Sequence, residues 1–155
     1  MNQAIVTLPG VTVAYLRQVG PYGAAIGPLW QKLRHWALPR GLWKESMVCY
    51  GISHDDPTTT PLEKCRYDAC IEVPPAMVVD GGAERAELPG GLYARLTFHG
   101  TPGDIPAGLD KLFHQIIPQA NKQFDFSRPI FELYRGITKM DADGSFGCDL
   151  CVPAK

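Results

Sequence analysis

Three features are missing from this sequence, and each absence excludes a class of protein. No apolar run approaches the roughly 18 residues that a membrane-spanning helix needs. Lys and Arg number 15 against 16 Asp and Glu, so the sequence lacks the basic excess that attracts nucleic acid. The first residues, 1–6, carry no charged segment ahead of an apolar stretch, which argues against a secretory signal. We therefore expect a cytoplasmic protein that contacts neither a membrane nor nucleic acid directly.

The cysteines do not form a recognisable framework. There are five (Cys49, Cys65, Cys70, Cys148 and Cys151), an odd number, so we predict reduced and mostly buried thiols rather than disulfides. Cys148 and Cys151 form a CxxC pattern, but their segment reads as a strand, on which that spacing places the two sulfurs on opposite faces. Cys65 and Cys70 are poorly spaced as a second ligand pair for zinc. The glycine pairs also lack the context of a phosphate-binding loop, and we expect neither a metal nor a cofactor.

What the sequence does contain is an internal repeat. Residues 13–20 align with residues 93–100 at an offset of 80, with Ala, Leu and Gly at matching positions. Towards the end of each copy, residues 68–71 align with residues 149–152 at an offset of 81. Because the matches keep their order and a nearly constant offset, they indicate two copies of one unit.

Both copies predict the same order of elements. Alternating patterns rich in β-branched and aromatic residues predict an opening strand, and an apolar stripe at helical spacing then predicts a helix. Two further strands close each unit. The predicted strands cover residues 11–19, 48–53 and 67–73 in one copy, and 92–99, 129–135 and 146–152 in the other. The fold class is therefore α+β: two tandem β-α-β-β repeats that form a pseudo-twofold, mainly antiparallel sheet domain with a ligand cleft between the halves.

We treat the whole chain, residues 1–155, as one domain. The first repeat covers about 5–74, a linker rich in Pro and Gly covers 75–91, and the second repeat covers about 92–155. In the second helix, Asp104 is the expected N-terminal cap and Pro118 the expected end.

Glu132 is the first candidate for a functional residue. It lies in a predicted strand whose alternation places Phe131 and Leu133 on one face and Glu132 and Tyr134 on the other. One interpretation is that this face is solvated and Glu132 is an ordinary solvent-exposed residue. The other is a carboxylate on an apolar cleft wall, where it would attract an organic cation or act as an acid or base with a raised pKa.

Aromatic residues strengthen the second interpretation. Aligning the second strands of the two repeats at an offset of 82 places Tyr50 over Glu132, as its symmetry mate across the cleft. Tyr67, Tyr15 and Trp36 are further candidates for the cleft wall. Trp36 also fits a position in the core, and Tyr15 also fits a position that simply covers the sheet. Aromatic faces and one carboxylate together bind flat lipophilic cations.

The histidines are weaker candidates for functional residues. His54 stands beside two aspartates, but the following proline and the polar surroundings predict a turn rather than a metal site. His35, His99 and His114 have no partners at a spacing that indicates a catalytic triad.

Several segments resemble the GyrI-like, or AraC-type effector-binding, domain family. Residues 13–22 are similar to its opening strand and turn, residues 50–57 and 65–68 to its first hairpin, and residues 131–134 and 148–153 to its last two strands. The resemblance covers the chain from about residue 5 onwards. It implies the duplicated β-α-β-β fold and a cleft for aromatic, often cationic, small molecules. It also implies that Glu132 is the acidic residue at the base of that cleft, and that Tyr50, Tyr67 and Tyr134 lie at its wall.

Three functions follow from the residues and the resemblance. The first is a stand-alone binder of lipophilic, cationic compounds that sequesters or senses them, because the chain begins directly at the ligand-binding domain. The second is a hydrolase of strained electrophilic natural products in which Glu132 activates water and Tyr134 orients or protonates the substrate. The third is an inhibitor that binds a protein such as DNA gyrase through its exterior. Either a monomer or a homodimer fits the sequence.

Overall fold

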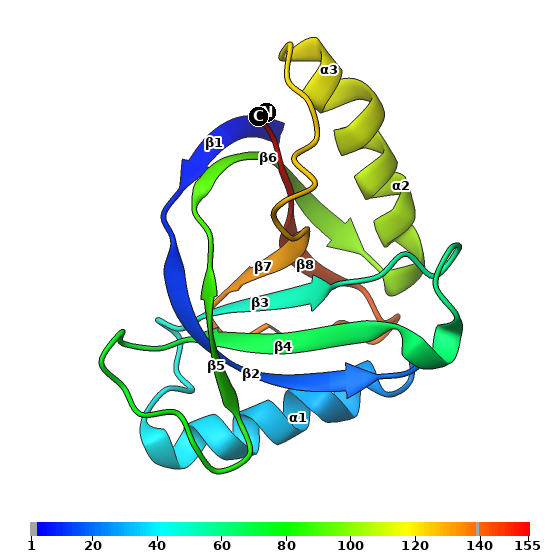
Figure 1. Cartoon of the computed structure of the whole chain (residues 1–155). Helices are drawn as coiled ribbons and strands as arrows, with labels where there is room; N and C mark the ends of the chain where they lie inside the picture. Colours follow the sequence, from blue (N-terminus) through cyan, green and yellow to red (C-terminus); the bar gives the residue numbers. More distant parts are fainter. Residues whose placement is uncertain (1–2, 139) are drawn as a thin grey trace.

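The protein is described by a computed structural model that covers residues 3–138 and 140–155. Its strands form one curled antiparallel sheet in the order β1-β6-β8-β7-β3-β4-β2-β5 (Figure 1). Among the described residues, no helix is long and apolar enough to cross a membrane. The strands are β1 (Gln3–Leu8), β2 (Val11–Val19), β3 (Val48–Ser53), β4 (Arg66–Glu72), β5 (Glu84–Leu88), β6 (Gly91–Gly100), β7 (Phe131–Arg135) and β8 (Phe146–Pro153). The longer helices are α1 (Ile26–Ala37) and α2 (Ile105–Lys111), and α2 continues through a π-helical turn (Leu112–Ile116) into α3 (Ile117–Gln119).

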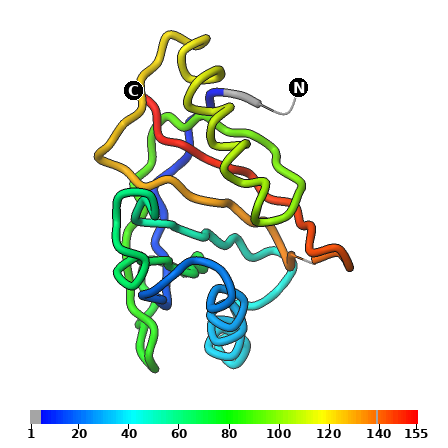
Figure 2. The backbone as a smooth tube through the Cα atoms, turned by 90° about the vertical axis from the view of Figure 1, so that its right-hand side faces the viewer, coloured from blue at the N-terminus to red at the C-terminus, as the bar shows by residue number. Residues whose placement is uncertain are grey.

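The predicted α+β fold is confirmed, and the duplication is visible in the order of the strands. In one half β2, α1, β3 and β4 follow one another, and in the other half β6, α2, β7 and β8 do. Strands β3 and β7 pair at the centre of the sheet and join the halves. Figure 2 shows the two halves from the side, with one helix to each: α1 below and α2 above.

The register at the centre corrects one prediction. Ile52 pairs with Asp68 in the first half and Leu133 with Asp149 in the second, so β3 and β7 correspond at an offset of 81. The predicted offset of 82 was therefore wrong by one residue. Gly51, rather than Tyr50, is the symmetry mate of Glu132, and the two pair directly across the β3–β7 ladder. Since a slip of one residue exchanges the faces of a strand, Tyr50 lies on the other side of the sheet.

Each half also receives an edge strand from the other half. β1 pairs with β6, and β5 pairs with β2, so part of the predicted linker 75–91 is a strand. The two connections cross where Leu8-Pro9-Gly10 and Leu88-Pro89-Gly90 repeat the same three residues. A Cβ atom on Gly90 would lie 2.5 Å from the backbone nitrogen of Gly10, so this crossing requires glycine.

The core has three parts. One apolar cluster lies between α1 and the first half of the sheet, and includes Leu29 and Leu33 from the predicted helical stripe. A second cluster lies between α2 and the other half. The third lies on the face of the sheet that the helices leave uncovered. Cys148 belongs to the second cluster and Cys151 to the third, as the strand interpretation of the CxxC pattern predicts, and all five cysteines are buried and free.

The second helix differs from its prediction in detail. Asp104 occupies the N-cap position of α2, as predicted, but its side chain makes no capping hydrogen bond to that helix. Its carboxylate instead accepts hydrogen bonds from the backbone and side chain of Thr101 and closes a capping box on the preceding 3-10 turn. Pro118 lies inside α3 rather than after the helix. Just before it, the backbone N–H of Ile117 bonds to the carbonyl of Leu112, a π-type bond five residues back.

Candidate ligand-binding site

Strand β7 places Glu132 and Tyr134 on the helix-covered side of the sheet, at the seam between the two halves. Tyr134 packs against both of the helix-covered clusters. Neighbouring Phe131 and Leu133 are buried in the cluster on the other face, so the predicted alternation of this strand is confirmed. Glu132 and Tyr134 are both partly exposed. Glu132 therefore lies where the halves meet, as a partly exposed residue.

Two tyrosines contact the Glu132 carboxylate, and Trp30 contacts both of them. The hydroxyl of Tyr134 donates a hydrogen bond to its Oε1 atom at 2.7 Å, and the hydroxyl of Tyr67 donates to the same atom at 3.3 Å. The indole Nε1–H of Trp30 donates to the Tyr67 hydroxyl at 3.2 Å. The rings of Trp30 and Tyr134 meet edge to face, with centroids 5.7 Å apart. These contacts join α1, β4 and β7 into one hydrogen-bonded aromatic group around a single acid.

The electrostatics of this group are unbalanced. Within the described part of the chain, no basic side chain forms an ion pair with Glu132. Burial raises the pKa of Glu132 above its ordinary value, while the hydrogen bonds from Tyr134 and Tyr67 act in the opposite direction. Burial and then the negative charge of Glu132 raise the pKa of both tyrosines, which keeps them protonated as donors. The site is thus a carboxylate held by neutral donors and lacking a counter-charge.

Gly51 makes room for this arrangement. A Cβ atom at this position would lie 2.2 Å from the Tyr67 hydroxyl oxygen and 2.8 Å from the Glu132 Oε1 atom. Both oxygens therefore lie directly over the backbone of β3. The symmetry mate of the acidic residue is thus a glycine, because any side chain there would occupy the space that the acid and its tyrosine partner share.

The structure brings together some of the predicted site residues and not others. Tyr67 and Tyr134 contact Glu132, as described above. Tyr50 and Tyr15 lie on the opposite face, where their hydroxyls donate to Glu72 at 3.0 Å and to Glu84 at 3.2 Å, respectively. Trp36 lies near the end of α1, where its ring packs under Arg40 and its Nε1–H donates to the carbonyl of Asp80 at 2.6 Å. The predicted wall positions of Tyr50, Tyr15 and Trp36 are therefore not part of this group.

Sequence reasoning missed Trp30 and Gly51. Trp30 follows Ile26 by four residues and precedes Leu33 by three, so a wider apolar stripe on α1 would have included it. Tyr22 was also missed; its ring packs edge-on against Tyr67 with centroids 6.4 Å apart. Gly51 could have been found from the correct register of the repeat, because an offset of 81 places it over Glu132.

The fold and this site define an α+β domain with an acid and aromatic rings between two repeated halves. The model of the GyrI-like small molecule binding domain family matches residues 1–155, and the chain belongs to this family. It is 32% identical over 154 residues to the SPbeta prophage-derived protein YosT of Bacillus subtilis, covering 99% of both chains. It is 28% identical over 159 residues to a protein of Edwardsiella ictaluri named DNA gyrase inhibitor, covering 100% of this chain and 99% of that one.

Solved structures share the fold at lower identity. The C-terminal domain of EcmrR superposes with a TM-score of 0.75 at 12% identity, over 99% of this chain and 96% of that one. A hydrolase from Listeria innocua gives 0.65 at 10%, over 99% and 92%. SAV2435, solved with bound tetraphenylphosphonium, gives 0.58 at 16%, over 100% and 94%. At these identities the comparisons show a common fold.

Proposed function

We propose that this domain binds lipophilic, aromatic cations at the Glu132 seam. The observation that carries the proposal is the carboxylate of the partly exposed Glu132, which two tyrosine hydroxyls hold and which no basic side chain among the described residues neutralises. A cationic ligand would supply the missing charge, and the rings of Trp30 and Tyr134 would offer apolar and π contacts to it. The SAV2435 complex with tetraphenylphosphonium supports this ligand class by analogy of fold.

Calorimetric titration with tetraphenylphosphonium tests the proposal. We expect the wild type to bind it and the Glu132→Gln variant to bind at least about tenfold more weakly, equivalent to about 1.4 kcal/mol. Glutamine keeps an oxygen for the tyrosine hydroxyls, so only the charge is removed. Glu63→Gln makes the same change at an exposed residue and is the matched control. Equal affinity in the wild type and Glu132→Gln would refute the proposal.

A second candidate function is hydrolysis of strained electrophiles at the same residues. The 2.7 Å hydrogen bond between Tyr134 and Glu132 favours it, because it pairs a proton donor with a carboxylate whose pKa burial raises, as a general base requires. A cyclopropane-type electrophile would be incubated with the wild type, Glu132→Gln and Tyr134→Phe. Turnover above the uncatalysed rate that both variants abolish would support catalysis. Product formation at the uncatalysed rate would exclude it for that substrate class.

The third candidate, inhibition of DNA gyrase through the exterior of the domain, rests on the names of relatives such as the Edwardsiella protein. A supercoiling assay with purified gyrase separates it from the first proposal. Inhibition by the wild type and equally by Glu132→Gln would indicate an exterior protein-binding surface. Absence of inhibition would leave the seam as the functional site.

A further inference from the structure

A cavity lies on the face of the sheet that the helices leave uncovered, away from Glu132. Its volume is about 520 Å³, within the range of small-molecule pockets. We call it the Arg17 cavity. Part of its lining is apolar, and the loop before β7 contributes to it. The apolar lining comes from Val13, Ile52, Leu88, Phe124, Phe126 and Ile130.

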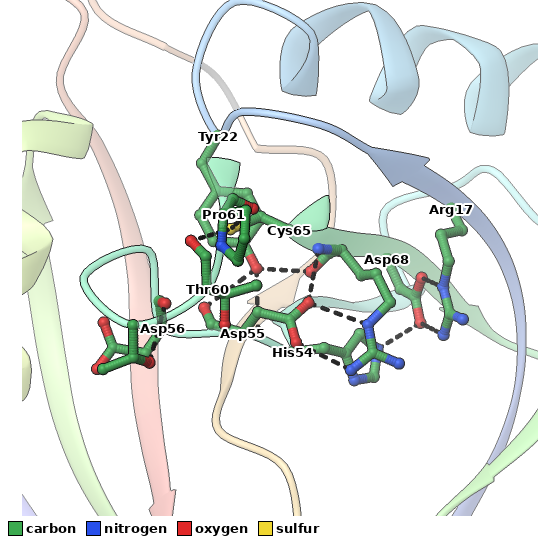
Figure 3. A network of polar contacts seen from close by, with 11 residues as sticks. Arg17, Tyr22, His54, Asp55, Asp56, Thr60, Pro61, Cys65 and Asp68 are labelled. Atoms are coloured by element: carbon green, nitrogen blue, oxygen red, sulfur yellow. Dashed lines mark hydrogen bonds and ion pairs between the residues drawn. The ribbon is translucent and has the colours of Figure 1, made fainter. Parts of the chain in front are cut away.

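The lining of the Arg17 cavity also includes a charged cluster (Figure 3). Asp68, with 4% of its surface exposed, accepts hydrogen bonds from Arg17 Nε at 2.7 Å and from Arg17 Nη2 at 2.9 Å. His54 Nε2 lies 2.6 Å from the second carboxylate oxygen. Burial alone would raise the pKa of Asp68, but the hydrogen bonds from His54 and Arg17 outweigh it and lower the pKa. A buried carboxylate thus fixes the orientation of two half-exposed nitrogen groups.

Those nitrogen groups have binding capacity left. A guanidinium has five N–H donors, and Asp68 receives two of them from Arg17, which leaves three for a ligand. The ring of His54 bonds to Asp68 through Nε2, which leaves Nδ1. The side chains of Arg17 and His54 are 36% and 24% exposed, so a ligand can reach both.

Other charged side chains around the cavity already form hydrogen bonds with neighbouring residues. The side chain of Glu87 alternates to the opposite face of β5, where it accepts hydrogen bonds from Thr12. Arg128 bonds to Asp125 at 3.0 Å and to backbone carbonyls. The hydroxyl of Tyr15, which lines the cavity, donates a hydrogen bond to Glu84. Among the described charged side chains that line the cavity, Arg17 keeps the most free N–H donors, three against two for Arg128, and it therefore offers a positively charged, bidentate surface to a molecule inside.

We propose that the Arg17 cavity binds a small apolar carboxylic acid. Its carboxylate would accept N–H donors from Arg17, and from His54 when that ring is protonated, while its apolar body would lie against Ile52 and Phe126. Asp68 acts as a positioning residue, because it holds the guanidinium in place. This site is independent of the cation site at Glu132: it lies on the other face of the sheet and selects the opposite charge.

Calorimetric titration with 2-naphthoate tests this proposal, with the neutral 2-naphthylmethanol as a ligand of matched shape. We expect the wild type to bind the acid at least about tenfold more tightly than the alcohol. Arg17→Gln should remove this preference, whereas Arg34→Gln, the same change on the exposed side of α1, should keep it. Phe126 is 86% exposed, so Phe126→Ala should fold normally and still weaken naphthoate binding severalfold.

Three results would overturn the proposal. One is equal binding of acid and alcohol. Another is unchanged naphthoate affinity in a folded Arg17→Gln variant or, should that variant not fold, in Phe126→Ala. The third is displacement of naphthoate by saturating tetraphenylphosphonium, which would place both ligands in one site. If naphthoate binds as expected while phosphonium does not bind, the Arg17 cavity stands and the proposed function at Glu132 fails.

Discussion

The close approach at Gly51 gives a prediction with a definite size. In Gly51→Ala, the new Cβ atom would lie 2.2 Å from the Tyr67 hydroxyl oxygen, which must retreat by about 1 Å to reach an ordinary contact near 3.4 Å. Tyr67 is buried, so its ring has little space in which to move. The retreat breaks the hydrogen bonds from Tyr67 to Glu132 and from Trp30 to Tyr67.

The two broken hydrogen bonds and the overpacking give the expected loss of stability. Each hydrogen bond contributes about 1 kcal/mol net. Overpacking adds about 1 kcal/mol at least. The smaller conformational entropy of unfolded alanine returns about 0.5–1 kcal/mol. The expected net loss is about 2 kcal/mol, or roughly 4–8 °C in the thermal midpoint for a chain of this size.

Thermal unfolding and titration with tetraphenylphosphonium are the assays, and Gly27→Ala is the control. Gly27 lies in α1, and nothing would lie within 4 Å of its Cβ atom. This variant should gain about 0.5–1 kcal/mol from helix propensity and bind phosphonium as the wild type does. A Gly51→Ala variant with the midpoint and affinity of the wild type would refute the close approach of Tyr67 to β3.

Three further predictions concern single side chains. Burial holds the pKa of Glu132 above its unfolded value, so the folded state binds a proton more readily than the unfolded state, and the unfolding free energy falls as the pH rises above about 4.5. Glu132→Gln should remove this dependence of the unfolding free energy on pH and be more stable than the wild type at pH 7, as measured by urea titration. Trp30→Phe should abolish most of the change in tryptophan fluorescence on phosphonium binding, since Trp30 contacts Tyr134, and an undiminished change would place the ligand elsewhere. The pKa of Asp68 is lowered in the folded state, so its ionised carboxylate stabilises the fold above about pH 3.8, and this stabilisation is lost in acid. Asp68→Asn should therefore be less stable than the wild type by about 2 kcal/mol at pH 7 and lose less stability on acidification. The same loss of stability on acidification in both proteins would contradict the pairing of Asp68 with His54.

Most of the architecture could be predicted because local sequence patterns indicate its strands and helices. Sequence patterns predicted all six strands of the two repeats. Alternation predicted that Glu132 and Tyr134 share one face of β7 and Phe131 and Leu133 the other, but the structure was needed to show that the Glu132 face is the one covered by the helices. The edge strands β1 and β5 were missed because each pairs with the other half, a long-range pairing that local patterns do not specify. The repeated Leu-Pro-Gly at residues 8–10 and 88–90 was the overlooked signal, and it marks where the two connections cross.

The site was predicted only in part, for a physical reason. Placement of Glu132 and Tyr134 needs only the alternation of one strand, whereas placement of Tyr50 needs the register between two strands. Local patterns do not determine that register, and an error of one residue changed its face. Likewise, the contact between Trp30 and Tyr67 depends on how α1 packs on β4, and the bonds from Arg17 and His54 to Asp68 depend on how strands β2, β3 and β4 align.

A pair of ligands with the same shape and opposite charge tests the central claim most directly. Tetraphenylphosphonium and tetraphenylborate would each be titrated into the wild type and Glu132→Gln by calorimetry. Our account predicts that phosphonium binds the wild type and loses at least about tenfold in affinity in the variant, while borate gains nothing from the glutamate. Equal affinity of the wild type for both ions, unchanged by Glu132→Gln, would show that the carboxylate between the two halves does not select the ligand.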